Sequence, residues 1–308
     1  MKIVFMGSSD FGIAAFKELI KHHTIIGVVS TPAKPQGRGL KVVESPITVF
    51  AEENGIGPIL KPDDLKSPDF LNALKDLDAD LFVVVAFRIL PKSVFSIPHF
   101  GTVNIHASIL PKYRGPAPIQ RAIEAGEKET GVTIFKIDEG IDTGEILLQK
   151  SIPIQSEETT PDLFEKLSIA GAEMLVKAID NLGKGKVSFI PQEHGKSSKA
   201  PKLKKEEAHI DWLQSSLSIF NKIRAFKPFP GTYTVSGDKR LGIEWAEIVD
   251  ETTEGNSGVI KKVNESYFDV QCNPGILRVL RVKPEGRKVM DVHDFLLGNR
   301  LVEGDMLK

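Results

Sequence analysis

An amide and an imidazole lie two residues apart in the sequence, at the end of a short apolar segment. Asn104 and His106 hold these positions at the start of the stretch NIHASILPKYRG. Alternate residues of a β-strand point to the same face of its sheet, so the two side chains would project together. An amide donor can stabilise negative charge on a carbonyl oxygen, and an imidazole can move a proton near neutral pH. The pair predicts attack on an acyl carbonyl, while a hydrogen-bonded polar pair at a strand end is the alternative without catalysis.

A carboxylate that keeps the imidazole charged would have to come from another part of the chain. Residues 138–145, DEGIDTGE, supply the acidic side chains of Asp138, Glu139, Asp142 and Glu145. Asp142 lies in a Gly-x-Asp-x-Gly segment between Gly140 and Gly144, where the freedom of the backbone lets a side chain reach inward. A buried carboxylate beside the ring would stabilise imidazolium. The residue types alone leave Asp142 and its acidic neighbours open as candidates.

Strand-like and helix-like segments alternate through residues 1–183, and these elements would position the polar pair. Residues 81–86, LFVVVA, are apolar throughout, as expected of a central parallel strand buried on both faces. The alternation predicts an α/β fold, a Rossmann-like open and mostly parallel sheet with helices on both faces, which binds ligands at the carboxyl ends of its strands. The other expected strands are residues 2–6, 24–30, 102–106, 131–137 and 146–154, and the expected helices are residues 11–21 and 161–181.

The pattern changes after residue 190. Residues 191–205, PQEHGKSSKAPKLKK, have the polar, lysine-rich composition of a linker. A helix and several short strands follow, which predicts a small antiparallel, OB-like β-barrel. We therefore expect a catalytic domain over residues 1–190, a basic linker over 191–208 and a C-terminal β-barrel domain over 209–308.

Composition and charge exclude several classes of protein. The chain of 308 residues is 41% hydrophobic and 26% charged, and no apolar run reaches the length of a membrane span. A single cysteine, Cys272, excludes an internal disulfide framework; it fits a reducing cytoplasm and is expected to be a packing residue. The net charge of −1 does not indicate a nucleic-acid binder, but residues 184–205 hold seven lysines against Glu193 alone.

Motifs for common cofactors are missing. The first turn, GSSDFG, lacks the glycine spacing of a dinucleotide site, and Ile190 stands where a P-loop ending in residues 195–197 would require glycine. His22 and His23 are adjacent, and neighbouring residues of a helix cannot converge on one metal ion. The sequence therefore predicts no metal site.

Taken together, the motifs resemble those of the 10-formyltetrahydrofolate-dependent formyltransferase family. NIHASILPKYRG and GVTIFKIDEGIDTGE are similar to the Asn-x-His pair, the Ser-Leu-Leu-Pro-x-x-Arg-Gly turn and the Asp-Thr-Gly loop of that family. The resemblance extends to KIVFMGSSDFG at the start, AFRILP at 86–91, PAPIQRAI at 116–123 and RAFKPFPGTYT at 224–234. It implies 10-formyltetrahydrofolate as the formyl donor.

The resemblance also implies roles for individual residues. Asn104 and His106 would polarise the formyl oxygen, and Asp142 would hold His106 protonated. Arg88 replaces the glycine of an aromatic-Gly pair in the family and would place a charge beside the folate. The residues implied to bind folate are Ser108, Ile109, Leu110, Pro111, Phe87, Ile89 and Leu90.

The stretch TPAKPQGRGLKVVESP, residues 31–46, resembles an extra loop in those family members that act on initiator methionyl-tRNA. It implies that Arg38 enters the acceptor stem, and Lys41 adds positive charge to the same loop. The lysines of the linker, among them Lys204 and Lys205, are expected to track phosphates of the tRNA. A solvated linker is the alternative for the last two lysines. The basic run RVLRVKPEGRK, residues 278–288, would add a tRNA-facing surface in the last domain.

The implied reaction is transfer of the formyl group to the α-amine of methionyl-tRNA, which yields N-formylmethionyl-tRNA and tetrahydrofolate for translation initiation. Three alternatives stay open: formyl transfer to the amine of a sugar nucleotide, hydrolysis of the folate, and a non-catalytic folate- or RNA-binding module on the same scaffold. We expect a cytoplasmic monomer with no membrane partner.

Overall fold

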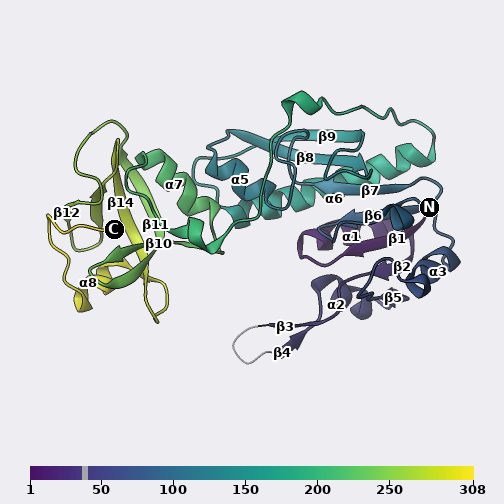
Figure 1. Ribbon diagram of the computed structural model, residues 1–308, viewed down its shortest axis with the longest axis horizontal. Coiled ribbons are helices and arrows are strands. Elements are labelled where there is room, and N and C mark those ends of the chain that lie inside the picture. The colour runs from purple at the N-terminus through teal and green to yellow at the C-terminus, as the bar shows by residue number, and fades with distance from the viewer. Residues whose placement is uncertain (37–40) are drawn as a thin grey trace. The chain divides into compact units, whose positions relative to one another are not determined.

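The computed structural model describes residues 1–36 and 41–308 (Figure 1). These residues form two compact units, each assembled from three stretches of chain. The first unit comprises Met1–Pro118, Glu129–Pro153 and Phe164–Ala200, and the second comprises Ile119–Lys128, Ile154–Leu163 and Pro201–Lys308. The expected division into a catalytic domain ending at residue 190 and a C-terminal domain beginning at residue 209 stays a prediction. Arg38, one of the expected tRNA contacts, lies outside the described residues.

The first unit is built on a sheet of seven strands in the order β5-β2-β1-β6-β7-β8-β9 (Figure 1). Neighbours from β5 to β7 are parallel, whereas β8 runs antiparallel to both β7 and β9. β6 is buried at every position, as its apolar sequence predicts. The Rossmann-like, mostly parallel sheet is therefore confirmed. The strands are β1 (Lys2–Gly7), β2 (Thr24–Val29), β5 (Ile59–Leu60), β6 (Leu81–Val85), β7 (Thr102–His106), β8 (Glu129–Lys136) and β9 (Ile146–Pro153).

Helices cover both faces of this sheet. On one face Phe5 of β1 stacks on Phe16 of α1 with ring centroids 4.5 Å apart, and Phe50 of α2 meets Phe16 edge-on. On the other face Val4 and Met6 of β1 share a core cluster with residues of α3 and α4. Because successive side chains of β1 point to opposite faces of the sheet, this strand contributes to the hydrophobic layer on each face. The helices are α1 (Phe11–His22), α2 (Pro46–Glu53), α3 (Pro68–Asp76), α4 (Lys92–Phe95) and α6 (Thr160–Gly183).

Two short strands, β3 (Lys34–Gln36) and β4 (Lys41–Val43), pair antiparallel within the stretch that was expected to form a loop. Val42 and Val43 are β-branched, which favours extended backbone and accounts for β4. Lys41 is the first residue of this strand.

The second unit is built on an antiparallel sheet in the order β10-β11-β14-β13-β12, with β15 paired to β14. Its outermost strands are β10 and β12, and residues near the end of the chain bridge both edges: Leu307 pairs with Ser236, and Met306 pairs with Val259. The sheet is barrel-like without being closed by its own strands. The elements are α5 (Pro118–Glu124), α7 (Ser216–Ala225), β10 (Thr232–Ser236), β11 (Lys239–Asp250), β12 (Ile260–Val263), β13 (Phe268–Gln271), β14 (Ile276–Pro284), β15 (Met290–Asp291) and α8 (Val292–Gly298).

Candidate active site

The predicted amide and imidazole both lie on β7, which pairs with β6 and β8. Asn104 is in register with Val84 of β6 and with Phe135 of β8, and His106 is in register with Thr133 of β8. His106 is buried. The Oδ1 atom of Asn104 is also buried, and no described residue donates a hydrogen bond to it. Because buried polar atoms in proteins are nearly always paired, this unpaired oxygen indicates a side chain that does not serve to satisfy a neighbour and is available to a ligand.

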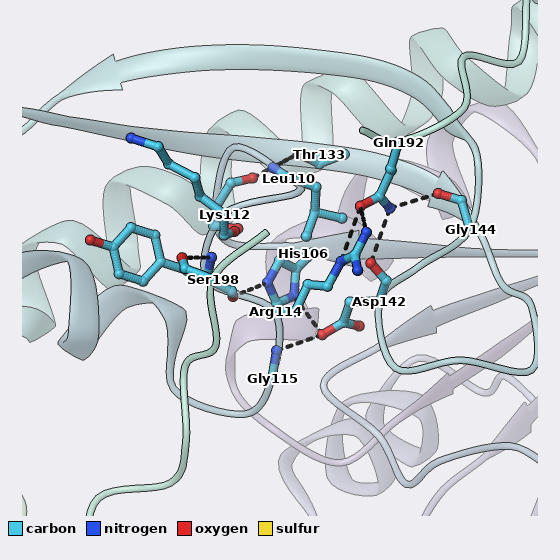
Figure 2. Close-up of polar contacts among 12 residues, drawn as sticks. His106, Leu110, Lys112, Arg114, Gly115, Thr133, Asp142, Gly144, Gln192 and Ser198 are labelled. Atoms are coloured by element: carbon cyan, nitrogen blue, oxygen red, sulfur yellow. Dashed lines mark hydrogen bonds and ion pairs between the residues drawn. The ribbon is translucent and has the colours of Figure 1, made fainter. Parts of the chain in front are cut away.

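Asp142 is the acidic residue that meets the imidazole. Its Oδ2 lies 3.6 Å from His106 Nδ1 and accepts a hydrogen bond of 2.8 Å from the backbone amide of Gly115 (Figure 2). The gap to the ring exceeds hydrogen-bond length, but contacts of this kind often shorten when substrate binds. Asp142 has a φ of +53°, the left-handed conformation that turns its side chain inward from the bend. The convergence of distant segments on one carboxylate fits the predicted pairing.

The neighbouring acidic residues take other positions. Asp138 accepts hydrogen bonds from the amide of Gly140 and the hydroxyl of Thr143, which shapes the bend. Glu139 forms an ion pair with Lys92. Glu145 is exposed to solvent, so Asp142 is the one of the four acidic candidates that faces the ring.

The second ring nitrogen of His106 also contacts the protein. Nε2 lies 2.8 Å from the backbone carbonyl oxygen of Tyr113 (Figure 2). The ring therefore faces a carbonyl oxygen on one side and a carboxylate on the other, and a doubly protonated imidazolium can donate to both. The turn of residues 113–115 thus holds both the ring, through the carbonyl of Tyr113, and the carboxylate of Asp142, through the amide of Gly115.

A hydrogen-bonded network shapes the loop that follows β7. The hydroxyl of Thr133 donates to the carbonyl of Ser108 at 2.7 Å and accepts from the amide of Leu110 at 3.2 Å. Gln149 donates to the carbonyl of Leu110 and to the hydroxyl of Thr133. Ser108 and Leu110 are buried, and the Ser108 hydroxyl donates to the carbonyl of Lys112. These contacts fix the path of the loop in which four of the expected folate-binding residues lie.

The other expected folate-binding residues follow β6. Leu90 is buried and Phe87 packs against the same core cluster, whereas Ile89 is 75% exposed. Ile141, in the bend that carries Asp142, is 58% exposed. Exposed aliphatic side chains at these positions are available to an apolar part of a ligand.

Arg88 is held by backbone groups. Its guanidinium donates to the carbonyls of Pro62 at 2.6 Å and Asp63 at 3.0 Å, and it lies 5.3 Å from the ring centroid of Phe87. Nε of Arg88 is buried and has no partner among the described residues. The side chain therefore directs two of its donors to the loop after β5.

Gln192 and Arg114 belong to the site, although neither was expected to have a role in it. Two nitrogens of Arg114 donate to Oε1 of Gln192, and Nε2 of Gln192 donates to the carbonyls of Asp142 and Gly144 (Figure 2). Gln192 is separated from these partners by 78, 50 and 48 residues. No motif in the sequence could have identified it.

The residues expected to contact tRNA are spread over both units. Lys41 belongs to the first unit, and Lys204 and Lys205 are exposed residues of the second. In the run 278–288, Arg278 is engaged by Asp269 through two hydrogen bonds of 2.8 and 3.0 Å and lies over the ring of Tyr267.

The bond to Asp269 raises the pKa of Arg278. Arg281 is paired with Asp291. The other basic residues of this run, Lys283, Arg287 and Lys288, are exposed to solvent and available to phosphate groups.

Cys272 is fully buried, and burial raises the pKa of its thiol to about 12. It is a packing residue, as expected.

The described part of the chain contains no group of His, Cys, Asp or Glu side chains arranged to hold a metal ion. Within residues 1–36 and 41–308, no helix combines the length and hydrophobicity that crossing a membrane requires.

Comparison with known proteins matches both the N-terminal and the C-terminal part of the chain to formyl transferases. Residues 1–179 match the formyl transferase family, and residues 202–300 match the formyl transferase C-terminal domain. A methionyl-tRNA formyltransferase of Caldanaerobacter subterraneus is 39% identical over 311 aligned residues, covering all of both chains. One from Thermodesulfovibrio yellowstonii is 42% identical, over 98% of this chain and 97% of its own.

A solved structure shares the fold at lower identity. The N-formyltransferase of Helicobacter canadensis, in complex with folinic acid and dTDP-3-aminofucose, superimposes with a TM-score of 0.69 at 22% identity. The match covers 91% of this chain and 98% of that one.

Proposed function

This chain belongs to the formyl transferase family, and we propose that it transfers the formyl group of 10-formyltetrahydrofolate to the α-amine of initiator methionyl-tRNA. The products are N-formylmethionyl-tRNA, which starts translation, and tetrahydrofolate. Relatives that carry the name methionyl-tRNA formyltransferase align over nearly the whole of this chain at about 40% identity, which supports this substrate. The observation that carries the chemistry is the 3.6 Å approach of Asp142 Oδ2 to Nδ1 of His106, two residues from Asn104 on the same strand.

Asn104 and His106 stabilise the oxyanion in this proposal. The neutral α-amine attacks the formyl carbon, and the electron pair of the C=O bond moves onto oxygen. Nδ2 of Asn104 donates to this oxygen, and Nε2 of His106 does so after it leaves the carbonyl of Tyr113. An amide donor that is already in place when charge develops lowers the barrier, because no solvent has to reorganise around it.

In this proposal Asp142 accepts the proton of the attacking amine and returns it to N10 of the folate. Its carboxylate stabilises the charged ring of His106 and takes the proton that the amine loses on attack. Collapse of the intermediate breaks the bond between the formyl carbon and N10 of the folate, and N10 receives that proton. The formyl group is then an amide on methionine, and tetrahydrofolate leaves.

Lys41, Lys204, Lys205 and Arg38 contact the tRNA in this proposal, and the C-terminal domain supplies further phosphate contacts. The expected monomer, the cytoplasmic compartment and the division into residues 1–190, 191–208 and 209–308 belong to the same proposal. Phosphate contacts make affinity fall steeply with salt, so tRNA binding measured between about 50 and 200 mM salt tests this part.

A transfer assay decides between acceptors. Donor labelled in its formyl group is offered with initiator methionyl-tRNA and with a nucleotide-linked amino sugar in parallel reactions. We expect label on the methionyl-tRNA, with little on the sugar. Preferential labelling of the sugar would replace the proposed substrate by the alternative one, and release of free formate would indicate hydrolysis of the folate.

A further inference from the structure

The segment expected to be a linker lies along the candidate active site. Within the first unit, the hydroxyl of Ser198 accepts a hydrogen bond from the amide of Tyr113 at 2.9 Å, and its carbonyl accepts from the amide of Arg114 at 2.9 Å. The amide of Ala200 donates to the carbonyl of Arg114 at 2.6 Å. Residues 198–200 therefore pair with the turn that contacts His106 and Asp142.

Gln192 holds the other side of the site. Its side chain is buried, with 7% exposed. Nε2 donates to the carbonyls of Asp142 at 3.0 Å and Gly144 at 2.7 Å, and Oε1 accepts from Nε and Nη2 of Arg114 at 3.2 and 2.6 Å. The amide can have only this orientation, because a guanidinium offers donors alone and carbonyl oxygens offer acceptors alone.

The bend that Gln192 contacts needs such support. Asp142 adopts a φ of +53°, which costs a non-glycine residue energy and persists where surrounding contacts over-determine it. Gly144 packs so closely that a Cβ there would lie 1.7 Å from the carbonyl oxygen of Lys136. The backbone on both sides of Thr143 is thus fixed by neighbours, and Gln192 supplies the hydrogen bonds.

We propose that Gln192 is a positioning residue for formyl transfer: it fixes the bend that carries Asp142 and ties that bend to Arg114, in the turn that holds His106. The inference rests on the proposed function for its kinetic test. Small displacements of a catalytic carboxylate cost large factors in rate, so the contribution of Gln192 appears in turnover and not in binding of the folate.

Two substitutions separate the two halves of the Gln192 side chain. Gln192→Ala removes both the donor and the acceptor, whereas Gln192→Glu keeps acceptor oxygens for Arg114 but cannot donate to the carbonyls of Asp142 and Gly144 when ionised. We expect both variants to lose about 10-fold or more in kcat, while KM for 10-formyltetrahydrofolate stays within about 2-fold. Wild-type turnover in Gln192→Glu would show that only the contact to Arg114 matters and would overturn the proposal. Gln214→Ala, which removes an exposed contact to Asp211, is the matched control.

A double-mutant cycle with Asp142→Asn distinguishes positioning from general damage. If Gln192 acts through Asp142, Gln192→Ala in the Asp142→Asn background costs less than about 2-fold, because the group it positions is already disabled. Equal losses in the two backgrounds would mean that Gln192 supports the fold alone, and the proposal would fall.

The backbone amide of Gly115 provides a readout that needs no substrate, since it donates to Asp142 Oδ2. In a glycine-labelled NMR spectrum, we expect its signal to move in Gln192→Ala in the direction seen in Asp142→Asn, and to stay in place in Gln214→Ala. An unmoved signal in Gln192→Ala would contradict the proposal. If the wild-type protein formylates no methionyl-tRNA, the proposed function fails, while the Gly115 signal still tests whether Gln192 positions Asp142.

Discussion

The carboxylate of Asp142 and the backbone amide of Gly115 are joined by a 2.8 Å hydrogen bond across 27 residues of sequence. The same oxygen lies 3.6 Å from the imidazole of His106, whose other nitrogen contacts the carbonyl of Tyr113. A single turn therefore orients the acid and the ring together.

Removing the amide of the polar pair should slow turnover without unfolding the protein. We expect Asn104→Ala to lower kcat by about 10²–10³-fold, the usual cost of losing one donor to an oxyanion. His106→Ala and Asp142→Asn should cost more, because the first removes an oxyanion donor together with the partner of Asp142, and the second removes the group that accepts the proton of the amine. Labelled formyl transfer under saturating donor measures these losses, with thermal unfolding as the control for folding. A His106→Ala variant that kept most of its activity would rule out the assigned role.

The hydroxyl of Thr133 should contribute to both stability and folate binding. Thr133→Val keeps the shape but leaves the carbonyl of Ser108, the amide of Leu110 and the amide of Gln149 with one partner fewer. We expect a loss of about 1–3 kcal/mol in the free energy of unfolding, the cost of unpaired buried groups, together with a higher KM for the formyl donor. Urea denaturation followed by circular dichroism measures the first.

Thr252→Val, at an exposed position, is the matched control for this variant and should leave both quantities near their wild-type values. A Thr133→Val protein of unchanged stability would show that the loop after β7 is held by other contacts.

The thiol of Cys272 should be unreactive in the folded protein. Its pKa of about 12 and its complete burial leave almost no accessible thiolate near pH 8, so a thiol reagent such as DTNB should react only as the second unit unfolds. Trp212 and Trp245, the two tryptophans of the chain, belong to the same unit and report its unfolding by fluorescence. Rapid labelling while tryptophan fluorescence remains native would contradict this expectation.

The shifted pKa of Cys272 also predicts a pH dependence of stability. Burial raises the pKa of the thiol from 9.0 in the unfolded chain to about 12 in the folded protein, so folding favours the neutral form. Its contribution to stability is complete below pH 9 and is lost as the pH rises towards 12. Cys272→Ala should therefore flatten the alkaline limb of a plot of unfolding free energy against pH, relative to the wild-type protein.

Arg38 should affect the choice of tRNA more than the use of folate. Arg38→Ala is expected to reduce the ratio of kcat/KM between initiator and elongator methionyl-tRNA, and to leave KM for 10-formyltetrahydrofolate unchanged. If Arg38 contacts a phosphate, the slope of log affinity against log salt should fall by about 1. Equal losses for tRNA and folate would argue that the substitution disturbs the protein in general.

The sequence predicts those features that depend on local patterns. The uninterrupted apolar run of β6 indicated a central parallel strand, and the spacing of Asn104 and His106 placed both on one face of β7. Glycines on both sides of Asp142 indicated a bend from which an acid could reach inward. The resemblance to a family then selected Asp142 from its neighbours.

Other features depend on contacts that no local pattern encodes. An alternating strand pattern is the same in either direction, so the antiparallel course of β8 between β7 and β9 was not predicted. The lysine-rich composition around Gln192 is typical of a solvated linker, and only the fold brings this residue to Arg114 and Asp142. The direction of Arg88, towards the carbonyls of Pro62 and Asp63, likewise follows from a loop distant in sequence.

The interleaving of the two units along the chain has a consequence for protein engineering. Because each unit draws on three separate stretches, no single cut yields a fragment that holds all of one unit and nothing of the other. A fragment that stopped at residue 190 would lack Gln192 and would carry residues 119–128 and 154–163 without the rest of their unit. Exchanging the second unit between relatives would therefore require grafting these internal segments as well.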